Sequence, residues 1–118
     1  AKRIQDAILG ATTAITSHFN DSFIYFNPHS IVSGDFYWFA DLPDDGLKIL
    51  VATDCTGHGV PGALMTVIGN NLLDEVILKE RITDPSLILK NIDTGLRNML
   101  KTEEAQSDVN DGMDMAVI

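Results

Sequence analysis

Two aspartates, Asp35 and Asp54, stand at the outer ends of two strand-like runs that a turn joins. The turn, Pro-Asp-Asp-Gly at residues 43–46, suits a four-residue hairpin loop. Pairing Leu42 with Leu47 across this loop and counting outward places Asp35 directly opposite Asp54. Residues in such a pair hold their Cβ atoms about 5 Å apart, so two ionised carboxylates there repel each other. A divalent cation such as Mg²⁺ or Mn²⁺, which takes oxygen ligands, would remove the conflict.

Two further cross-strand pairs favour the same register. It places Asp41 opposite Lys48, which is an attractive charge pair, and Trp38 opposite Val51, which joins an aromatic to a β-branched side chain. A slip by one residue would lose the charge pair. In the alternative, the register differs, so that one aspartate caps a turn and the other only solvates a strand end. The hairpin count by itself leaves the metal site and this alternative equally open.

The segment DCTGHGVPG at residues 54–62 leads from the second strand into a helix. Its glycines allow a sharp turn that exposes backbone amides, and the positive end of the helix favours a phosphate. Gly57, His58 and Gly59 are therefore the candidate phosphate-binding residues. The segment matches neither the P-loop nor the dinucleotide-binding pattern, so the spacing alone favours a tight connection that needs glycine for its shape. His58 is a candidate metal ligand or general acid, although a single loop histidine more often bonds to backbone.

Cys55 and Asp114 are the other residues with chemistry to explain. No histidine with an orienting partner is evident for Cys55, so we interpret it as a buried small residue whose backbone contributes. Asp114 lies within the apolar run MDMAVI at residues 113–118, where a carboxylate needs a partner. It is either a third acidic group at the site of Asp35 and Asp54 or a strand end that faces water, and the sequence leaves both readings open.

The elements that position these residues follow from the spacing of apolar side chains. We expect helices over residues 2–19, 61–80 and 85–101, strands over 22–27, 34–41, 47–54 and 113–118, and a polar loop over 102–112. Ile4 and Ile8 begin the apolar stripe of the first helix. Asp84 followed by Pro85 is a typical start for the last helix. The strand at 47–54 contains a continuous apolar run, which predicts burial of both faces.

Composition bounds the class of function. The chain has 118 residues, which is the length of one domain, and its net charge of −9 disfavours binding to nucleic acid or anionic membranes. A single cysteine fits a reducing compartment, and no apolar run is long enough to span a bilayer, so we expect a cytoplasmic domain. Because the sequence ends within an apolar strand, we also expect it to be a fragment of a longer domain.

Three motifs carry a family resemblance: IVSGDFYWF, VATDCTGHGVPGALMT and DGMDMAVI. In this order and at these separations they resemble the bacterial branch of the metal-dependent protein phosphatases, the PPM or protein phosphatase 2C-like family. Stage II sporulation protein E and the regulators of stress-response sigma factors typify that branch. The resemblance implies an α+β fold, a layered α-β-β-α phosphatase sandwich, of which residues 21–118 would form the N-terminal portion, about the first half to two-thirds. Residues 1–20 would be the helix that links it to an upstream sensor or signalling domain.

The resemblance also implies a phosphoserine/phosphothreonine protein phosphatase with a centre of two Mn²⁺ or Mg²⁺ ions that activate the attacking water. In the family pattern Asp35 and Asp54 are the catalytic metal ligands and Cys55 offers its backbone carbonyl to a metal. Asp114 matches an acidic position in the next strand. The family's further metal-binding aspartate, in a Thr-Asp-Gly-like strand end, is absent from this sequence, so the chain would hold only part of the centre and is expected to be inactive or weakly metal-binding by itself.

The resemblance implies two partners: a small anti-anti-sigma-type protein phosphorylated on serine, and the upstream sensor domain. If the parent protein is attached to a membrane, this upstream domain would provide the attachment. Open sheet edges favour self-association, so a homodimer is a further expectation. The competing interpretation is a non-catalytic regulatory or interaction module that keeps the phosphatase fold. The two acidic ligands, Asp35 and Asp54, argue mildly for the enzyme.

Overall fold

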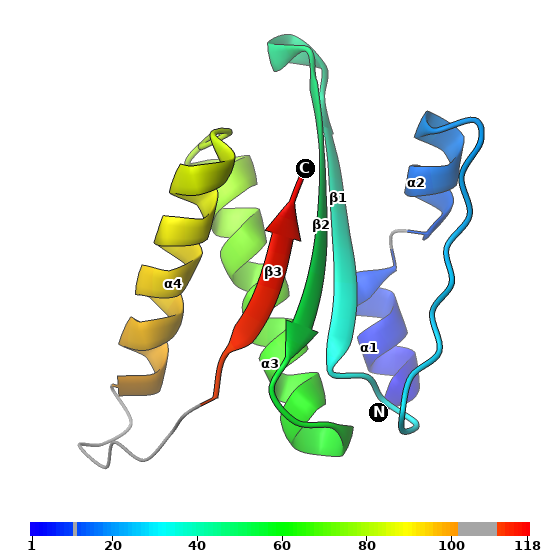
Figure 1. The fold of residues 1–118 in the computed structure, drawn as a ribbon, viewed down its shortest axis with the longest axis vertical. Coiled ribbons are helices and arrows are strands. Elements are labelled where there is room, and N and C mark those ends of the chain that lie inside the picture. The colour runs from blue at the N-terminus through cyan, green and yellow to red at the C-terminus, as the bar shows by residue number, and fades with distance from the viewer. Residues whose placement is uncertain (11, 102–110) are drawn as a thin grey trace.

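The computed structural model describes residues 1–10, 12–101 and 111–118, and its helices pack around a three-stranded sheet (Figure 1). The elements in chain order are α1 (Lys2–Leu9), α2 (Thr12–His18), β1 (Asp35–Leu42), the short 3₁₀ helix η1 (Pro43–Asp45), β2 (Leu47–Cys55), α3 (Gly59–Leu73), the π-helix η2 (Asp74–Lys79), α4 (Pro85–Lys101) and β3 (Met113–Val117). In Figure 1, α1 and α2 lie beside β1, whereas α4 lies beside β3. The expected α+β class is confirmed.

The sheet has the order β1-β2-β3 with both pairs antiparallel. The predicted hairpin register is confirmed, since Asp35 pairs with Asp54 and Trp38 with Val51. β1 and β2 begin and end within one residue of the predicted bounds, and the predicted last strand is confirmed as β3. β3 adds to the free edge of β2 and places Asp114 opposite Asp54.

One face of the sheet forms the core with α3, η2 and α4. Alternate residues of β1 and β2 point into this core, among them Trp38 and Val51, and the most deeply buried helical side chains include Leu73, Ile77 and Ile88. The indole N–H of Trp38 donates a hydrogen bond to a carboxylate oxygen of Asp74 over 2.9 Å. Burial of this apolar surface holds β1 and β2 in a fixed orientation.

The opposite face of the sheet is covered only in part. Phe26 packs edge-on against Tyr37 of β1 with ring centroids 5.7 Å apart, but Ala52 of β2 and Ala116 of β3 are exposed. The prediction that β2 is buried on both faces is therefore wrong for the described part of the chain. A continuous apolar run shows only that a strand can be buried on both faces. Whether each face is buried depends on other elements of the fold that pack against it.

The N-terminal helix predicted over residues 2–19 is wrong as a single element. α1 ends at Leu9, before Gly10, and a separate α2 follows at Thr12–His18. The buried face of α1 also differs from the predicted stripe, because Ile4 is 67 % exposed and the buried residue is Gln5. Glycine has low helix propensity, which accounts for the break, and the polar contacts of Gln5 decide which face of α1 turns inward.

The strand predicted over residues 22–27 is also wrong. This segment is extended but pairs with no strand among the described residues, and Phe23 and Tyr25 are 88 % and 83 % exposed. β-propensity expresses how well a side chain fits a paired, half-buried surface, so a β-rich segment without a partner strand remains a loop.

The helices after the hairpin follow the sequence closely. The helix predicted over 61–80 begins at Gly59 as α3 and continues beyond Leu73 as η2. α4 begins at Pro85 as predicted, and the carboxylate of Asp84 accepts a hydrogen bond of 2.8 Å from the Ser86 amide. Most of the polar loop predicted at 102–112 lies outside the described residues. Within the described part of the chain, no helix combines the length and the apolar character that crossing a bilayer requires.

Candidate functional site

Asp35 and Asp54 form a pair of carboxyl groups at one end of the sheet. Asp35 is the first residue of β1, and Asp54 stands opposite it in β2. Burial, although incomplete, raises the pKa of the Asp35 carboxyl above its ordinary value, and the hydrogen bond to Asp54 and the negative charge of Asp54 raise this pKa further. The two side chains are therefore close enough to share a proton. When both carboxyl groups are ionised they repel each other, and a bound proton or cation would relieve this repulsion.

Asp114 extends this pair into a row of three aspartates across β1, β2 and β3, because it lies directly opposite Asp54. All three line an open hollow of about 510 Å³ on the uncovered face of the sheet, together with side chains such as Tyr25 and Tyr37. Asp114 thus occupies the same row and also faces water. Within the described residues, however, no group of three or more His, Cys, Asp or Glu side chains is gathered closely enough to hold a metal ion.

The turn before Asp35 is fixed by backbone contacts with the loop after β2. The Cys55 N–H donates to the Gly34 carbonyl over 2.9 Å, and the Asp35 N–H donates to the Ser33 hydroxyl, also over 2.9 Å. A Cβ added at Gly34 would lie 2.5 Å from the Gly57 carbonyl oxygen, closer than real Cβ contacts allow. Only glycine lets the two loops approach this closely.

Gln5 of α1 is a contributor that the sequence reasoning missed. Its side-chain amide donates to the Ser33 carbonyl over 2.8 Å and accepts from the Ser33 N–H over 2.9 Å. It also donates to the Thr66 hydroxyl of α3 over 3.1 Å. The spacing of apolar residues cannot predict such a contact, because the partners of Gln5 lie 28 and 61 residues away. The signal available in the sequence was a polar residue without an evident partner in an amphipathic helix.

Thr56 is a second contributor that was not anticipated. Its N–H and its hydroxyl each donate to the Gly112 carbonyl over 2.9 Å, and its hydroxyl oxygen accepts from the Gly112 N–H over 2.8 Å. These bonds tie the loop after β2 to the segment that precedes β3. They fix the start of β3, and with it Asp114, beside Asp54.

Cys55 lies beneath the aspartates rather than beside them. Its thiol is buried on the core face of β2, and burial, with smaller effects of the charges of Asp35 and Asp54, raises its pKa to about 12. A thiol with that pKa is protonated at neutral pH and is a poor nucleophile. The Cys55 carbonyl oxygen lies on the Gly34 side of the strand, 3.4 Å from the position a Cβ at Gly34 would take.

The glycine-rich loop leads from this site into α3. Gly57 and Gly59 have φ angles of +88° and +65°, a conformation that other residues adopt only with strain. His58 is the N-cap residue of α3, but its side chain makes no capping hydrogen bond, and its ring lies 4.6 Å from the ring of His29. The structure thus brings His58 to a second histidine, His29, which no sequence pattern pairs with it.

Comparison with solved structures finds the same fold in a known domain. A solved structure described as the SiaA-PP2C domain of Pseudomonas aeruginosa superposes with a TM-score of 0.81 at 32 % sequence identity, over 98 % of this chain and 44 % of that chain. No family model and no curated protein sequence matches. The chain spans less than half the length of the structure it matches. It is a PP2C-like partial domain, as its sequence motifs indicated.

Proposed function

We propose that the protein containing this chain is a metal-dependent serine/threonine protein phosphatase. The observation that carries the proposal is the facing pair of Asp35 and Asp54, which stands at one end of the sheet in a chain with a PP2C-like fold. Repulsion between two such carboxylates is costly without a counter-charge. A divalent cation bound between the two carboxylates would supply that charge.

The residues of this site fit a hard divalent cation such as Mn²⁺ or Mg²⁺. Asp35 and Asp54 would supply carboxylate oxygens, Cys55 a backbone carbonyl oxygen, and Asp114 a further carboxylate from β3. These ions often bind through one or two carboxylates and keep several waters, so the facing pair of Asp35 and Asp54 is sufficient to begin such a site. When bound, such ions lower the pKa of a water and neutralise phosphoryl charge.

The chain's own residues would hold the substrate phosphate next to that pair. Gly57 and Gly59 turn the backbone sharply at the start of α3, and backbone amides at a helix N-terminus favour an anion. The exposed His58 side chain borders the same loop. The open hollow along Asp35, Asp54 and Asp114 leaves the site accessible to a phosphorylated side chain on another protein.

The substrate that we propose is a phosphoserine in a small anti-anti-sigma-type regulatory protein. In this proposal α1 and α2 connect the phosphatase to an upstream sensor domain, and the enzyme works in the cytoplasm. The net charge of −9 agrees with a protein substrate better than with a nucleic acid.

The test uses the intact protein that contains this chain. With Mn²⁺ or Mg²⁺ we expect hydrolysis of p-nitrophenyl phosphate and of a phosphoserine protein, and with excess chelator we expect none. Asp54→Asn should reduce activity to the chelated level while the circular dichroism spectrum is unchanged. Asp44→Asn, in the turn at the far end of the hairpin, is the matched control and should retain activity. Activity that survives both chelation and Asp54→Asn would overturn the proposal.

A second candidate function is a non-catalytic interaction module that keeps the fold. The observation in its favour is that the described residues assemble no cluster of three metal-ligating side chains. Such a module would bind the regulatory protein equally well with and without phosphate on its serine, and would release no phosphate. The same assay, run with a pull-down of phosphorylated and unphosphorylated protein, separates the two functions.

A further inference from the structure

We propose that Gln5 is a positioning residue for Asp35, so that the N-terminal helix α1 helps to set the geometry of the metal-binding carboxylates. This inference rests on the proposed function. Gln5 touches neither Asp35 nor Asp54 in any recorded contact; it acts through the Ser33–Gly34 turn that leads into β1.

Gln5 binds Ser33 as a neighbouring strand would. Its amide N–H donates to the Ser33 carbonyl and its amide oxygen accepts from the Ser33 N–H, over 2.8 and 2.9 Å. The side chain is only 7 % exposed, so its polar atoms would be costly to bury without these partners. Both ends of one planar amide therefore fix the position and the orientation of a single residue, Ser33.

Ser33 passes that constraint to Asp35. The Ser33 hydroxyl accepts the Asp35 N–H over 2.9 Å, and the intervening Gly34 carbonyl accepts the Cys55 N–H over 2.9 Å. Gly34 also packs closely against the Gly57 carbonyl, where a Cβ would not fit, and this limits movement of the turn toward that loop. A displacement of Ser33 must therefore move the Asp35 backbone or break one of these bonds.

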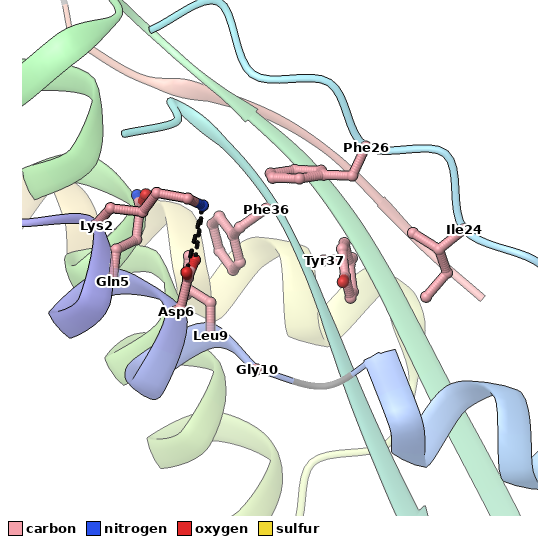
Figure 2. A pocket seen from close by; sticks show the side chains of 9 residues that line it. All are labelled: Lys2, Gln5, Asp6, Leu9, Gly10, Ile24, Phe26, Phe36 and Tyr37. Atoms are coloured by element: carbon pink, nitrogen blue, oxygen red, sulfur yellow. Dashed lines mark hydrogen bonds and ion pairs between the residues drawn. The ribbon is translucent and has the colours of Figure 1, made fainter. Parts of the chain in front are cut away.

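Besides Gln5, the residue of α1 that packs against the hydrophobic core is the partly buried Leu9. Ile4 is exposed, and a hollow of about 340 Å³ is lined by residues that include Gln5, Leu9 and Phe36 (Figure 2). The ion pair between Lys2 and Asp6, drawn in the same view, is solvent-exposed, and such pairs contribute little. Among the described residues, the hydrogen bonds of Gln5 to Ser33 are thus the main polar interaction between α1 and the turn before Asp35.

A structural role alone would also make Gln5 variants less stable, so the test needs a control that removes buried hydrogen bonds at the same place. Thr66→Val is that control, because it removes the Gln5–Thr66 hydrogen bond in the same buried place but leaves both bonds to Ser33. The test variant is Gln5→Leu, which keeps a similar volume and removes the amide. Thermal unfolding of both variants compares their stabilities.

Two readouts separate positioning from stability. The first is hydrogen exchange of the Ser33 and Asp35 amides, followed by NMR in the intact protein without metal; we expect faster exchange in Gln5→Leu and unchanged exchange in Thr66→Val. The second is Mn²⁺ affinity by calorimetry. There we expect a loss of about 10- to 100-fold for Gln5→Leu, the range seen when groups that orient a metal ligand are removed, and wild-type affinity for Thr66→Val.

The outcomes distinguish this inference from the proposed function. If Asp54→Asn abolishes Mn²⁺ binding but Gln5→Leu binds Mn²⁺ as the wild type does, the positioning role is wrong and the phosphatase proposal stands. If the wild type binds no Mn²⁺, the proposed function fails, and unchanged exchange of the Asp35 amide in Gln5→Leu would overturn the positioning role as well. Should Gln5→Leu not fold, Ser33→Ala is the second variant, because it removes the hydrogen bond between the Ser33 hydroxyl and the Asp35 N–H. Wild-type Mn²⁺ affinity in Ser33→Ala would overturn the inference.

Discussion

Asp35 and Asp54 face each other across β1 and β2, and burial, together with the neighbouring Asp54, raises the pKa of the Asp35 carboxyl. Because the pKa of Asp35 is raised in the folded state, folding takes up a proton at this site. The corresponding stability is present below the ordinary pKa of 3.8 and is lost as the pH rises through the higher folded-state value.

We therefore predict that Asp54→Asn reduces this loss of stability. The asparagine cannot repel an ionised Asp35, so the melting temperature in chelator should fall less between pH 4 and pH 6 than that of the wild type. Other groups titrate in this range, so the quantity to compare is the difference between the two proteins at each pH. Parallel curves would show that the two carboxylates do not interact.

Cys55 should be unreactive in the folded protein. The residue is 3 % exposed and the pKa of its thiol is raised to about 12, so both access to the thiol and the thiolate population are low. We expect a thiol reagent at pH 8 to modify Cys55 only as fast as the protein unfolds, and rapidly in denaturant. Fast labelling of the native protein, with circular dichroism unchanged, would contradict the buried orientation.

Gly34→Ala should destabilise the protein and disturb the site. The new Cβ would meet the Gly57 carbonyl oxygen at 2.5 Å, and overpacking of this kind costs about 1–3 kcal/mol of unfolding free energy. Gly112→Ala is the matched control, because a Cβ there would meet nothing within 4 Å. Urea denaturation measures both free energies, and equal stabilities would contradict the close approach of the two loops.

The hairpin was predictable because its signals are local and agree with one another. The turn at 43–46, the pair of Asp41 with Lys48 and the pair of Trp38 with Val51 all specify one register, and a slip of one residue would reverse every side chain. α4 was predictable for a similar reason, since Asp84 and Pro85 mark its start. Asp35 and Asp54 could therefore be placed together before their surroundings were known.

Features that depend on distant partners were not predictable from local pattern. Residues 22–27 have the composition of a strand, but none of the strands in the described ranges pairs with them. Gln5 looks like a solvent-facing residue until α1 is placed against Ser33 and Thr66, and Thr56 gains its role only when β3 returns beside β2. In each case tertiary contacts override the local preference.

The central claim is that the Asp35–Asp54 pair binds a divalent metal ion. The most direct test is a Mn²⁺ titration of the intact protein followed by electron paramagnetic resonance, in which free Mn²⁺ gives a sharp signal and bound Mn²⁺ a broadened one. We predict saturable loss of the sharp signal with the wild type and with Asp44→Asn, and its persistence with Asp35→Asn and Asp54→Asn. Equal Mn²⁺ binding by the wild type and Asp54→Asn would contradict the claim.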